Sequence, residues 1–121
     1  MSTAPGGFQA LTRQTTAQLA GFRSGAAEAS KAFGQLGQAA MAEGVLDKTT
    51  KELIALALGV GARCDPCIGY HTQALVKLGA SRQALIETLA VAVYMGGGPS
   101  LMYAAQAISA FDEFSAAAAS G

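Results

Sequence analysis

The chain has 121 residues, of which 51% are hydrophobic and 13% charged, and its formal net charge at pH 7 is zero. This length suits a single domain with a core of its own, and the charge balance excludes electrostatic binding to nucleic acid or to anionic membranes. A surface with so few charges favours self-association. We therefore expect one domain over residues 1–121 that forms a homo-oligomer.

The residue pattern predicts helices throughout. Ala, Leu and Gln are frequent, and no segment alternates between apolar and polar residues as a half-buried strand does. The first helical region runs from Phe8 to about Met41, where apolar side chains recur every three or four residues. Its glycines predict a break near Gly34–Gly37. We expect this region either to lie across the core or to reach onto a neighbouring subunit.

Two further helices follow a turn at Gly44–Asp47. Asp47 is a favourable N-cap for a helix from about Lys48 to Gly59, which is apolar on most faces and is therefore expected to be the buried central helix. Asp65 as a cap and Pro66 at the first helical position predict the start of the next helix. That helix is expected to end near Leu78, with Gly79 after it as a C-terminal cap.

The last two helices are separated by three glycines. Ser81 is expected to cap a helix from Arg82 to about Met95, and Pro99 to begin one that runs to about Phe114. We expect the tail, Ala116–Gly121, to be frayed. Together the segments predict an all-α fold, a compact bundle of about five to six helices joined by short turns.

The two cysteines are the most informative polar residues. No apolar stretch reaches the roughly 20 residues that span a bilayer, and the first ten residues lack the features of a secretion signal. We therefore expect a cytoplasmic protein, in which two cysteines three residues apart are typical of a redox pair or half of a metal site. Cys64 and Cys67 straddle a predicted helix start, whose free N–H groups and partial positive charge favour the reactive thiolate.

His71 and Glu52 are candidates for moving the thiol proton. His71, the only histidine, follows Cys67 by one helical turn and lies on the same face. Glu52 is the acidic residue of the apolar central helix and, near a histidine, would hold its tautomer or relay a proton. Taken singly, His71 is more typical of a surface or hydrogen-bonded core histidine, and Glu52 of a first-turn acid.

Taken together, these residues form a specific motif: Glu52, eleven residues, Cys64, two residues, Cys67, three residues, His71. In this pattern the chain resembles the alkylhydroperoxidase D family, within the wider carboxymuconolactone decarboxylase superfamily. The flanking segments Lys51–Leu56 and Tyr94–Ala104 also resemble that family. The resemblance covers roughly residues 46–114, and the first forty residues carry no signature of it.

The resemblance implies a thiol-dependent peroxidase of the antioxidant defence. It implies an all-α fold assembled into homotrimers or homohexamers, with Cys67 as the peroxidatic nucleophile, Cys64 as the resolving thiol, and Glu52 and His71 as the proton relay. It implies no bound cofactor, but a redox-active Cys64–Cys67 disulfide that an external dithiol protein reduces, either lipoyl-bearing or thioredoxin-like. Pro66 occupies the place of a second relay histidine in the best-characterised members, so the relay expected here is shorter.

Four other functions fit parts of the pattern. A general thiol–disulfide oxidoreductase or redox sensor would use the same residues and is the main alternative. Decarboxylation is disfavoured because the decarboxylases of the superfamily lack the cysteine pair, and only Arg63 and Arg82 lie nearby to hold an acidic lactone. A zinc site of the four motif residues would be cramped between Cys67 and His71. A purely structural oligomer would leave the motif without a role.

Overall fold

The computed structural model describes residues 7–120, and the elements within this part of the chain are helices joined by short turns. The all-α prediction is confirmed. The six helices are α1 (Gly7–Gly25), α2 (Ala27–Met41), α3 (Lys48–Gly61), α4 (Asp65–Lys77), α5 (Arg82–Gly96) and α6 (Gly98–Ser120). None of these six helices is both long and apolar enough to cross a membrane.

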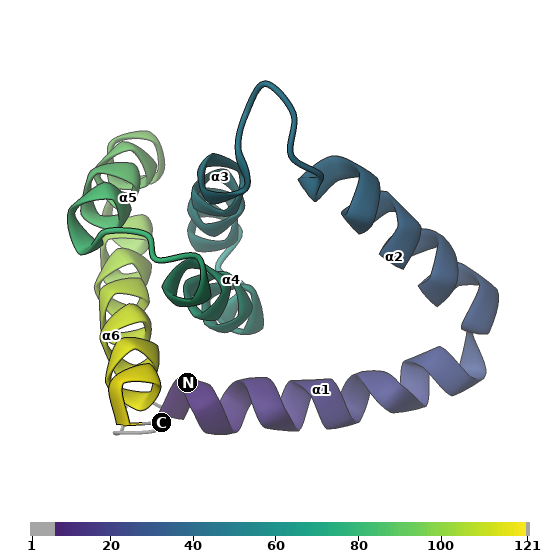
Figure 1. The fold of residues 1–121 in the computed structure, drawn as a ribbon. Helices are drawn as coiled ribbons and strands as arrows, with labels where there is room; N and C mark the ends of the chain where they lie inside the picture. Colours follow the sequence, from purple (N-terminus) through teal and green to yellow (C-terminus); the bar gives the residue numbers. More distant parts are fainter. Residues whose placement is uncertain (1–6, 121) are drawn as a thin grey trace.

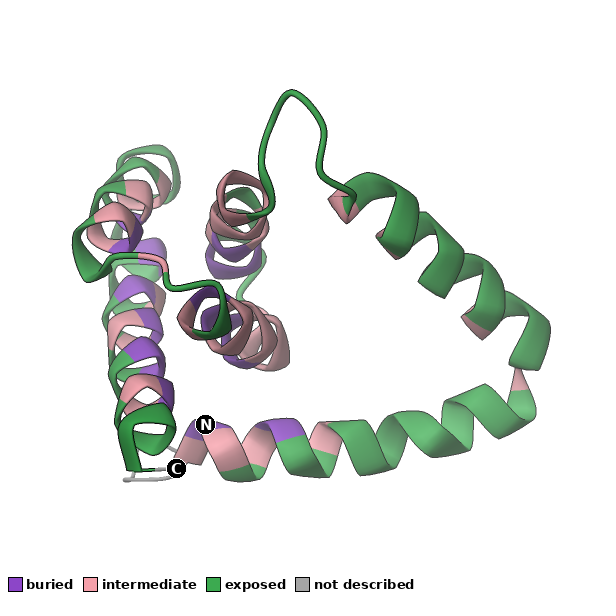
Figure 2. Cartoon of the chain, viewed as in Figure 1, coloured by how far each residue is buried: buried purple, intermediate pink, exposed green. Residues whose placement is uncertain are grey.

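Four helices and the start of α1 form the bundle (Figure 1). Helix α4 packs against α3, α6 and α1, and α5 packs against α3 and α6. The buried apolar side chains come from each of these helices and from none in α2 (Figure 2). They are Phe8, Leu56, Val60, Ile68, Leu75, Leu85, Leu89, Ala104, Ala107, Ala110, Phe111 and Phe114.

Side-chain caps begin two of these helices as the sequence predicts. The Asp47 carboxylate accepts a hydrogen bond from the Thr50 backbone N–H at 2.7 Å, and this bond holds the pKa of Asp47 below its usual value. The Ser81 hydroxyl accepts one from the Ala84 N–H at 3.0 Å. The two caps fix where α3 and α5 start and so help to set their register in the bundle.

The start of α1 is fixed to the bundle by two contacts distant in sequence. The Glu113 carboxylate accepts hydrogen bonds from the backbone N–H groups of Phe8 at 3.1 Å and Gln9 at 2.7 Å, so a side chain of α6 caps α1. At Gly69 in α4, an added Cβ would lie 2.6 Å from Cγ2 of Thr12. Glycine is therefore needed there to let α1 lie directly on α4.

The rest of α1 and all of α2 leave the bundle as a projecting arm, residues 18–41 (Figure 1). Nearly all of its residues are exposed, and it carries large apolar side chains such as Phe22 and Phe33, the latter 75% exposed. The Lys51 ammonium of α3 holds the far end of the arm by donating to the carbonyl oxygens of Ala40 at 2.9 Å and Ala42 at 2.6 Å. The bundle is thus compact, and the arm is not part of it.

Two sequence-based predictions about helix ends are wrong. The break in the first helical region lies at Ala26, and α2 runs without interruption through Gly34 and Gly37. Each interior glycine costs a helix about 1 kcal/mol, which is too little to end it when the flanking residues are good helix formers. Helix α6 continues to Ser120 instead of fraying after residue 116, because the tail is rich in alanine. Gly121 lies outside the described residues.

Candidate functional site

The candidate site is built on the hairpin of α3 and α4. The two helices are joined by residues 62–64, and Gly59 of α3 lies against Cys67 of α4. A Cβ added at Gly59 would stand 3.1 Å from the Cβ of Cys67. The helices therefore approach each other closely at the position where the cysteine pair begins.

The turn of the hairpin contains a strained residue. Arg63 has a φ of 58°, in the left-handed region that glycine usually occupies at helix ends. The turn is closed by hydrogen bonds from the backbone N–H of Arg63 to the Val60 oxygen at 3.1 Å and from that of Cys64 to the Gly59 oxygen at 3.0 Å. This conformation costs an arginine about 1–2 kcal/mol, and it delivers Cys64 to the first turn of α4.

Cys64 and Cys67 form a disulfide across the start of α4, with their Cα atoms 5.2 Å apart. The N-cap of α4 is Cys64 itself, whose Sγ accepts a hydrogen bond from the Cys67 N–H at 3.2 Å. The prediction that Asp65 caps this helix is wrong, because Cys64 has the extended backbone of a cap and Asp65 is already helical. The Oδ1 atom of Asp65 is buried and has no hydrogen-bond partner within residues 7–120.

His71 and Glu52 meet across the hairpin. Nδ1 of His71 lies 2.6 Å from Oε1 of Glu52, and the two side chains are 30% and 17% exposed. A carboxylate at Nδ1 favours the tautomer that carries its proton there, and this leaves Nε2 as the ring atom that can accept a further proton. Long helical side chains lean towards the N-terminus of their helix, so the ring of His71 leans towards the turn that holds Cys67.

The structure thus brings all four predicted residues into one region, between α3 and the first two turns of α4. The spacing of four residues is enough to place His71 beside Cys67. The contact of Glu52 with His71 depends on how α3 packs on α4, which sequence position alone does not determine. Sequence reasoning overlooked the close packing at Gly59, for which a small residue on an apolar helix was the available signal. It also overlooked the left-handed Arg63, which nothing in the pattern marks.

Other polar residues near the site have packing roles. The Tyr70 hydroxyl, one residue before His71, contacts the Thr16 hydroxyl and donates to the Thr12 carbonyl oxygen at 3.1 Å, which ties α4 to α1. Within the described chain, no group of three or more His, Cys, Asp or Glu side chains is arranged to hold a metal ion.

Comparison with known proteins places this hairpin in a family. The profile of the carboxymuconolactone decarboxylase family matches residues 27–110, which is more than half of the chain. The chain belongs to the carboxymuconolactone decarboxylase family. This confirms the superfamily that the Glu-Cys-Cys-His motif indicated.

Two solved structures of the carboxymuconolactone decarboxylase family share the fold over most of this chain. The apo form of lpg0406 from Legionella pneumophila is 57% identical, with a TM-score of 0.89 over 91% of this chain and 98% of that one. TM1620 from Thermotoga maritima is 30% identical, with a TM-score of 0.81 over 91% of this chain and 94% of that one. A role in the antioxidative response has been suggested for the Thermotoga protein.

Curated relatives are similar over a shorter range. The uncharacterised protein H16_B0147 of Cupriavidus necator is 43% identical over 88 residues, 73% of this chain and 78% of the relative. Uncharacterised protein 4 in the cox locus of Paracoccus denitrificans is 35% identical over 86 residues, 71% of this chain and 78% of the relative. Neither name states an activity.

Proposed function

We propose that this member of the carboxymuconolactone decarboxylase family is a thiol-dependent peroxidase that reduces organic hydroperoxides. The observation that carries the proposal is the His71–Glu52 pair at 2.6 Å, placed one helical turn from a bonded cysteine pair. A disulfide-forming pair alone would support electron exchange. A histidine held by a carboxylate beside that pair adds the proton transfer that breaking an O–O bond needs.

The reaction starts from the reduced pair. His71, held by Glu52, takes the proton of the Cys67 thiol, and the thiolate attacks the terminal oxygen of ROOH. The O–O bond breaks, Cys67 becomes a sulfenic acid, and the leaving alkoxide receives the proton from His71 and departs as ROH. The Cys64 thiol then attacks the sulfenic sulfur, which releases water and forms the disulfide. Each turnover reduces one peroxide and oxidises one dithiol.

An external dithiol protein completes the cycle. Two thiols of the donor reduce the Cys64–Cys67 disulfide by exchange and leave the donor as a disulfide. Both cysteines are half-buried rather than fully enclosed, which supports access for a donor thiol. We propose a lipoyl-bearing or thioredoxin-like protein as this donor.

The test is the reduction of cumene hydroperoxide by the full chain in the presence of dihydrolipoamide. We expect turnover in the wild type and a loss of more than about a thousandfold in Cys67→Ser, because the nucleophile is removed. Cys64→Ser should leave a sulfenic acid on Cys67 that dimedone traps, as mass spectrometry would show. Full peroxidase activity in Cys67→Ser would overturn the proposal, and an adduct on Cys64 in the Cys67 variant would exchange the two roles.

Glu52→Gln separates a peroxidase from a general thiol–disulfide oxidoreductase. The amide keeps the shape of Glu52 but not its charge, so we expect peroxide reduction to fall by about ten- to a hundredfold. Exchange with a small disulfide needs no proton for an alkoxide and should change less. The matched control is Glu87→Gln on the exposed face of α5. Equal losses in the peroxide and disulfide assays would favour a general thiol–disulfide oxidoreductase. Pro66 is compatible with that function, because it stands in place of a second relay histidine.

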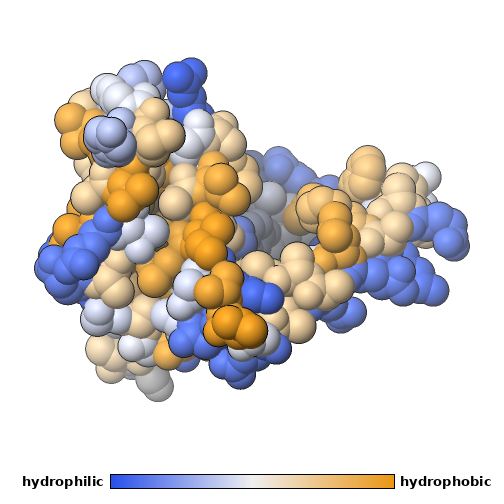
Figure 3. Space-filling model, turned by 90° about the horizontal axis from the view of Figure 1, so that it is seen from above, coloured by the Kyte–Doolittle hydropathy of each residue, from blue (hydrophilic) through white to orange (hydrophobic). Residues whose placement is uncertain are grey.

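We also propose that the chain works as a homotrimer or homohexamer, with the arm as the contact between subunits. The arm exposes Phe22, Phe33 and Leu36, and the face of α3 and α5 exposes Leu58, Val91 and Met95 around a hollow of about 590 Å³. Figure 3 shows apolar side chains gathered on both the bundle and the arm. Phe22→Ser with Phe33→Ser should lower the mass measured by sedimentation while the far-UV spectrum is kept. An unchanged mass would exclude the arm as the contact.

A further inference from the structure

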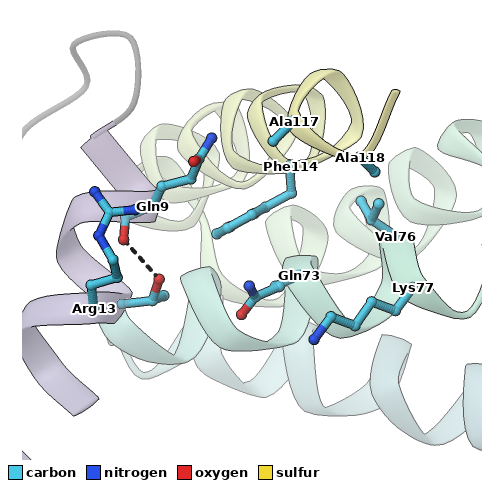
Figure 4. A pocket seen from close by; sticks show the side chains of 9 residues that line it. Gln9, Arg13, Gln73, Val76, Lys77, Phe114, Ala117 and Ala118 are labelled. Carbon is cyan, nitrogen blue, oxygen red and sulfur yellow. Dashed lines mark hydrogen bonds between the residues drawn. The ribbon is translucent and has the colours of Figure 1, made fainter. Parts of the chain in front are cut away.

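A second hollow lies away from the cysteine pair, where α1, α4 and α6 meet. Its volume is about 400 Å³, within the range of sites for small molecules. Phe114, Val76, Ala117 and Ala118 form its apolar part. Its polar lining consists of Gln9, Thr12, Arg13, Gln73 and Lys77. Figure 4 shows Arg13 and Lys77 on different sides of the hollow, with the ring of Phe114 between the helices that carry them.

The hollow carries two positive charges that no acidic side chain among the described residues pairs with. Neither Arg13 nor Lys77 has an ion-pair partner within 4.0 Å among residues 7–120, where the two ion pairs are His71–Glu52 and Arg82–Asp112. Glu113, the acidic residue next to Phe114, accepts hydrogen bonds from backbone N–H groups of α1 with both of its carboxylate oxygens. Lys77 has a structural role available to it, since it lies in the last turn of α4 and complements the helix dipole. Arg13, in the interior of α1, has no such role.

Free donors also surround the hollow. The side-chain amides of Gln9 and Gln73 make no hydrogen bond within the described chain, nor do the two cationic groups. A guanidinium pairs with a carboxylate through two parallel N–H donors, and neighbouring amides can supply more. The lining therefore combines cationic and amide donors from α1 and α4 with an aromatic and aliphatic surface that comes mainly from α6.

We propose that this hollow binds a small amphiphilic carboxylate, with its carboxylate at Arg13, the positive charge of Lys77 attracting it from another side of the hollow, and its alkyl chain against Phe114. The apolar part favours an alkyl chain over a simple inorganic anion, which would leave that surface unused. This site is distinct from the proposed peroxidase site. Gln73 is two residues beyond His71, about 200° further around α4, and it faces α1 while His71 faces α3.

Titration with sodium octanoate, followed by amide NMR shifts, tests the proposal. We expect saturable shifts at Gln9, Gln73 and Ala117, with a dissociation constant on the order of 1 mM for a ligand of this size. Replacing both cations, Arg13→Gln with Lys77→Gln, should weaken binding at least about tenfold, since hydrogen bonds to charged groups are lost. The control is Arg23→Gln with Lys31→Gln, which removes the same charge from the arm and should leave binding unchanged.

Three results would overturn the proposal. If octan-1-ol binds as tightly as octanoate, the negative charge of the ligand has no part in recognition. If inorganic phosphate binds as tightly as octanoate, the apolar surface of the hollow has no part in it. Binding within twofold of the wild type in the Arg13 and Lys77 variant would place octanoate elsewhere. Ala117→Leu, on an exposed position of α6, fills the hollow and should weaken octanoate binding while both charges remain.

Discussion

The bundle and the arm contain similar residues and use them differently. Helix α2 has leucine and phenylalanine at helical spacing, as α6 has, yet it buries none of them, whereas α6 buries Phe111 and Phe114. An apolar stripe therefore predicts that a helix packs, but not that it packs on its own chain. In this molecule the bundle holds the candidate site, and the arm holds apolar surface that stays exposed within residues 7–120.

The two regions should differ most in how much stability is lost when a leucine is replaced by alanine. Leu75 is fully buried in α4, so Leu75→Ala should lower the free energy of unfolding by about 2–5 kcal/mol. Leu36→Ala makes the same change at a 61% exposed position of the arm and should change it by less than about 0.5 kcal/mol in the monomer. Urea denaturation at low protein concentration measures both. Similar costs for the two variants would break the distinction between bundle and arm.

Replacing a glycine by alanine should change the stability of the bundle and of the arm in opposite directions, by smaller amounts than the leucine variants. Gly69→Ala would push a methyl group against Thr12 and should destabilise the fold by about 1–3 kcal/mol. Gly34→Ala, in the middle of α2 with open space around it, should stabilise its helix by about 0.5–1 kcal/mol. Thermal unfolding of both variants would show the two signs. A stabilising Gly69→Ala would mean that α1 lies less tightly on α4 than described.

The tie between the arm and α3 predicts a local effect. Lys51→Met removes the donor to the carbonyl oxygens of Ala40 and Ala42, a loss of about 0.5–1.5 kcal/mol. Amide hydrogen exchange in the last turn of α2 should become up to about tenfold faster, while exchange in the bundle core should not change. Lys48→Met, at an exposed position near Lys51, serves as the control. Faster exchange throughout the chain would show that the arm supports the bundle after all.

The smallest expected change in stability comes from breaking the ion pair between α5 and α6. Arg82 donates two hydrogen bonds to Asp112, at 2.9 and 3.0 Å, and these hold the pKa of Asp112 below its usual value. Asp112→Asn should cost less than about 1 kcal/mol at pH 7, because both side chains are exposed. A lowered carboxyl pKa stabilises the fold above its unfolded value of 3.8 and stops doing so as the pH falls through the native pKa. The difference between variant and wild type should therefore shrink below pH 3.8, as urea titrations would show.

Much of the fold follows from local signals in the sequence. Asp47, Ser81 and the glycines between α5 and α6 each act within one helical turn, so the ends they predict agree with the structure to within a few residues. The break at Ala26 and the projection of α2 were not predictable in this way. Both depend on which surfaces pack together, and a periodic pattern does not carry that information.

The candidate site likewise contains residues whose proximity local spacing predicts and one whose position depends on packing. Cys64, Cys67 and His71 lie within two turns of one helix, so their spacing predicts their proximity. Glu52 comes from another helix, and only the family motif indicated that it belongs with them. Its contact with His71 requires the close approach at Gly59 and the left-handed turn at Arg63, and both are consequences of how the hairpin packs.

Because the α3–α4 hairpin is closely packed, the number of residues between Glu52 and Cys64 is itself important for the site. Glu52 and Gly59 are two helical turns apart, and Gly59 is fixed against Cys67, so the eleven-residue gap determines the direction in which Glu52 points. One residue inserted between Glu52 and Gly59 would rotate Glu52 by about 100° away from His71. Homologous or engineered chains can therefore vary the composition of this gap far more freely than its number of residues.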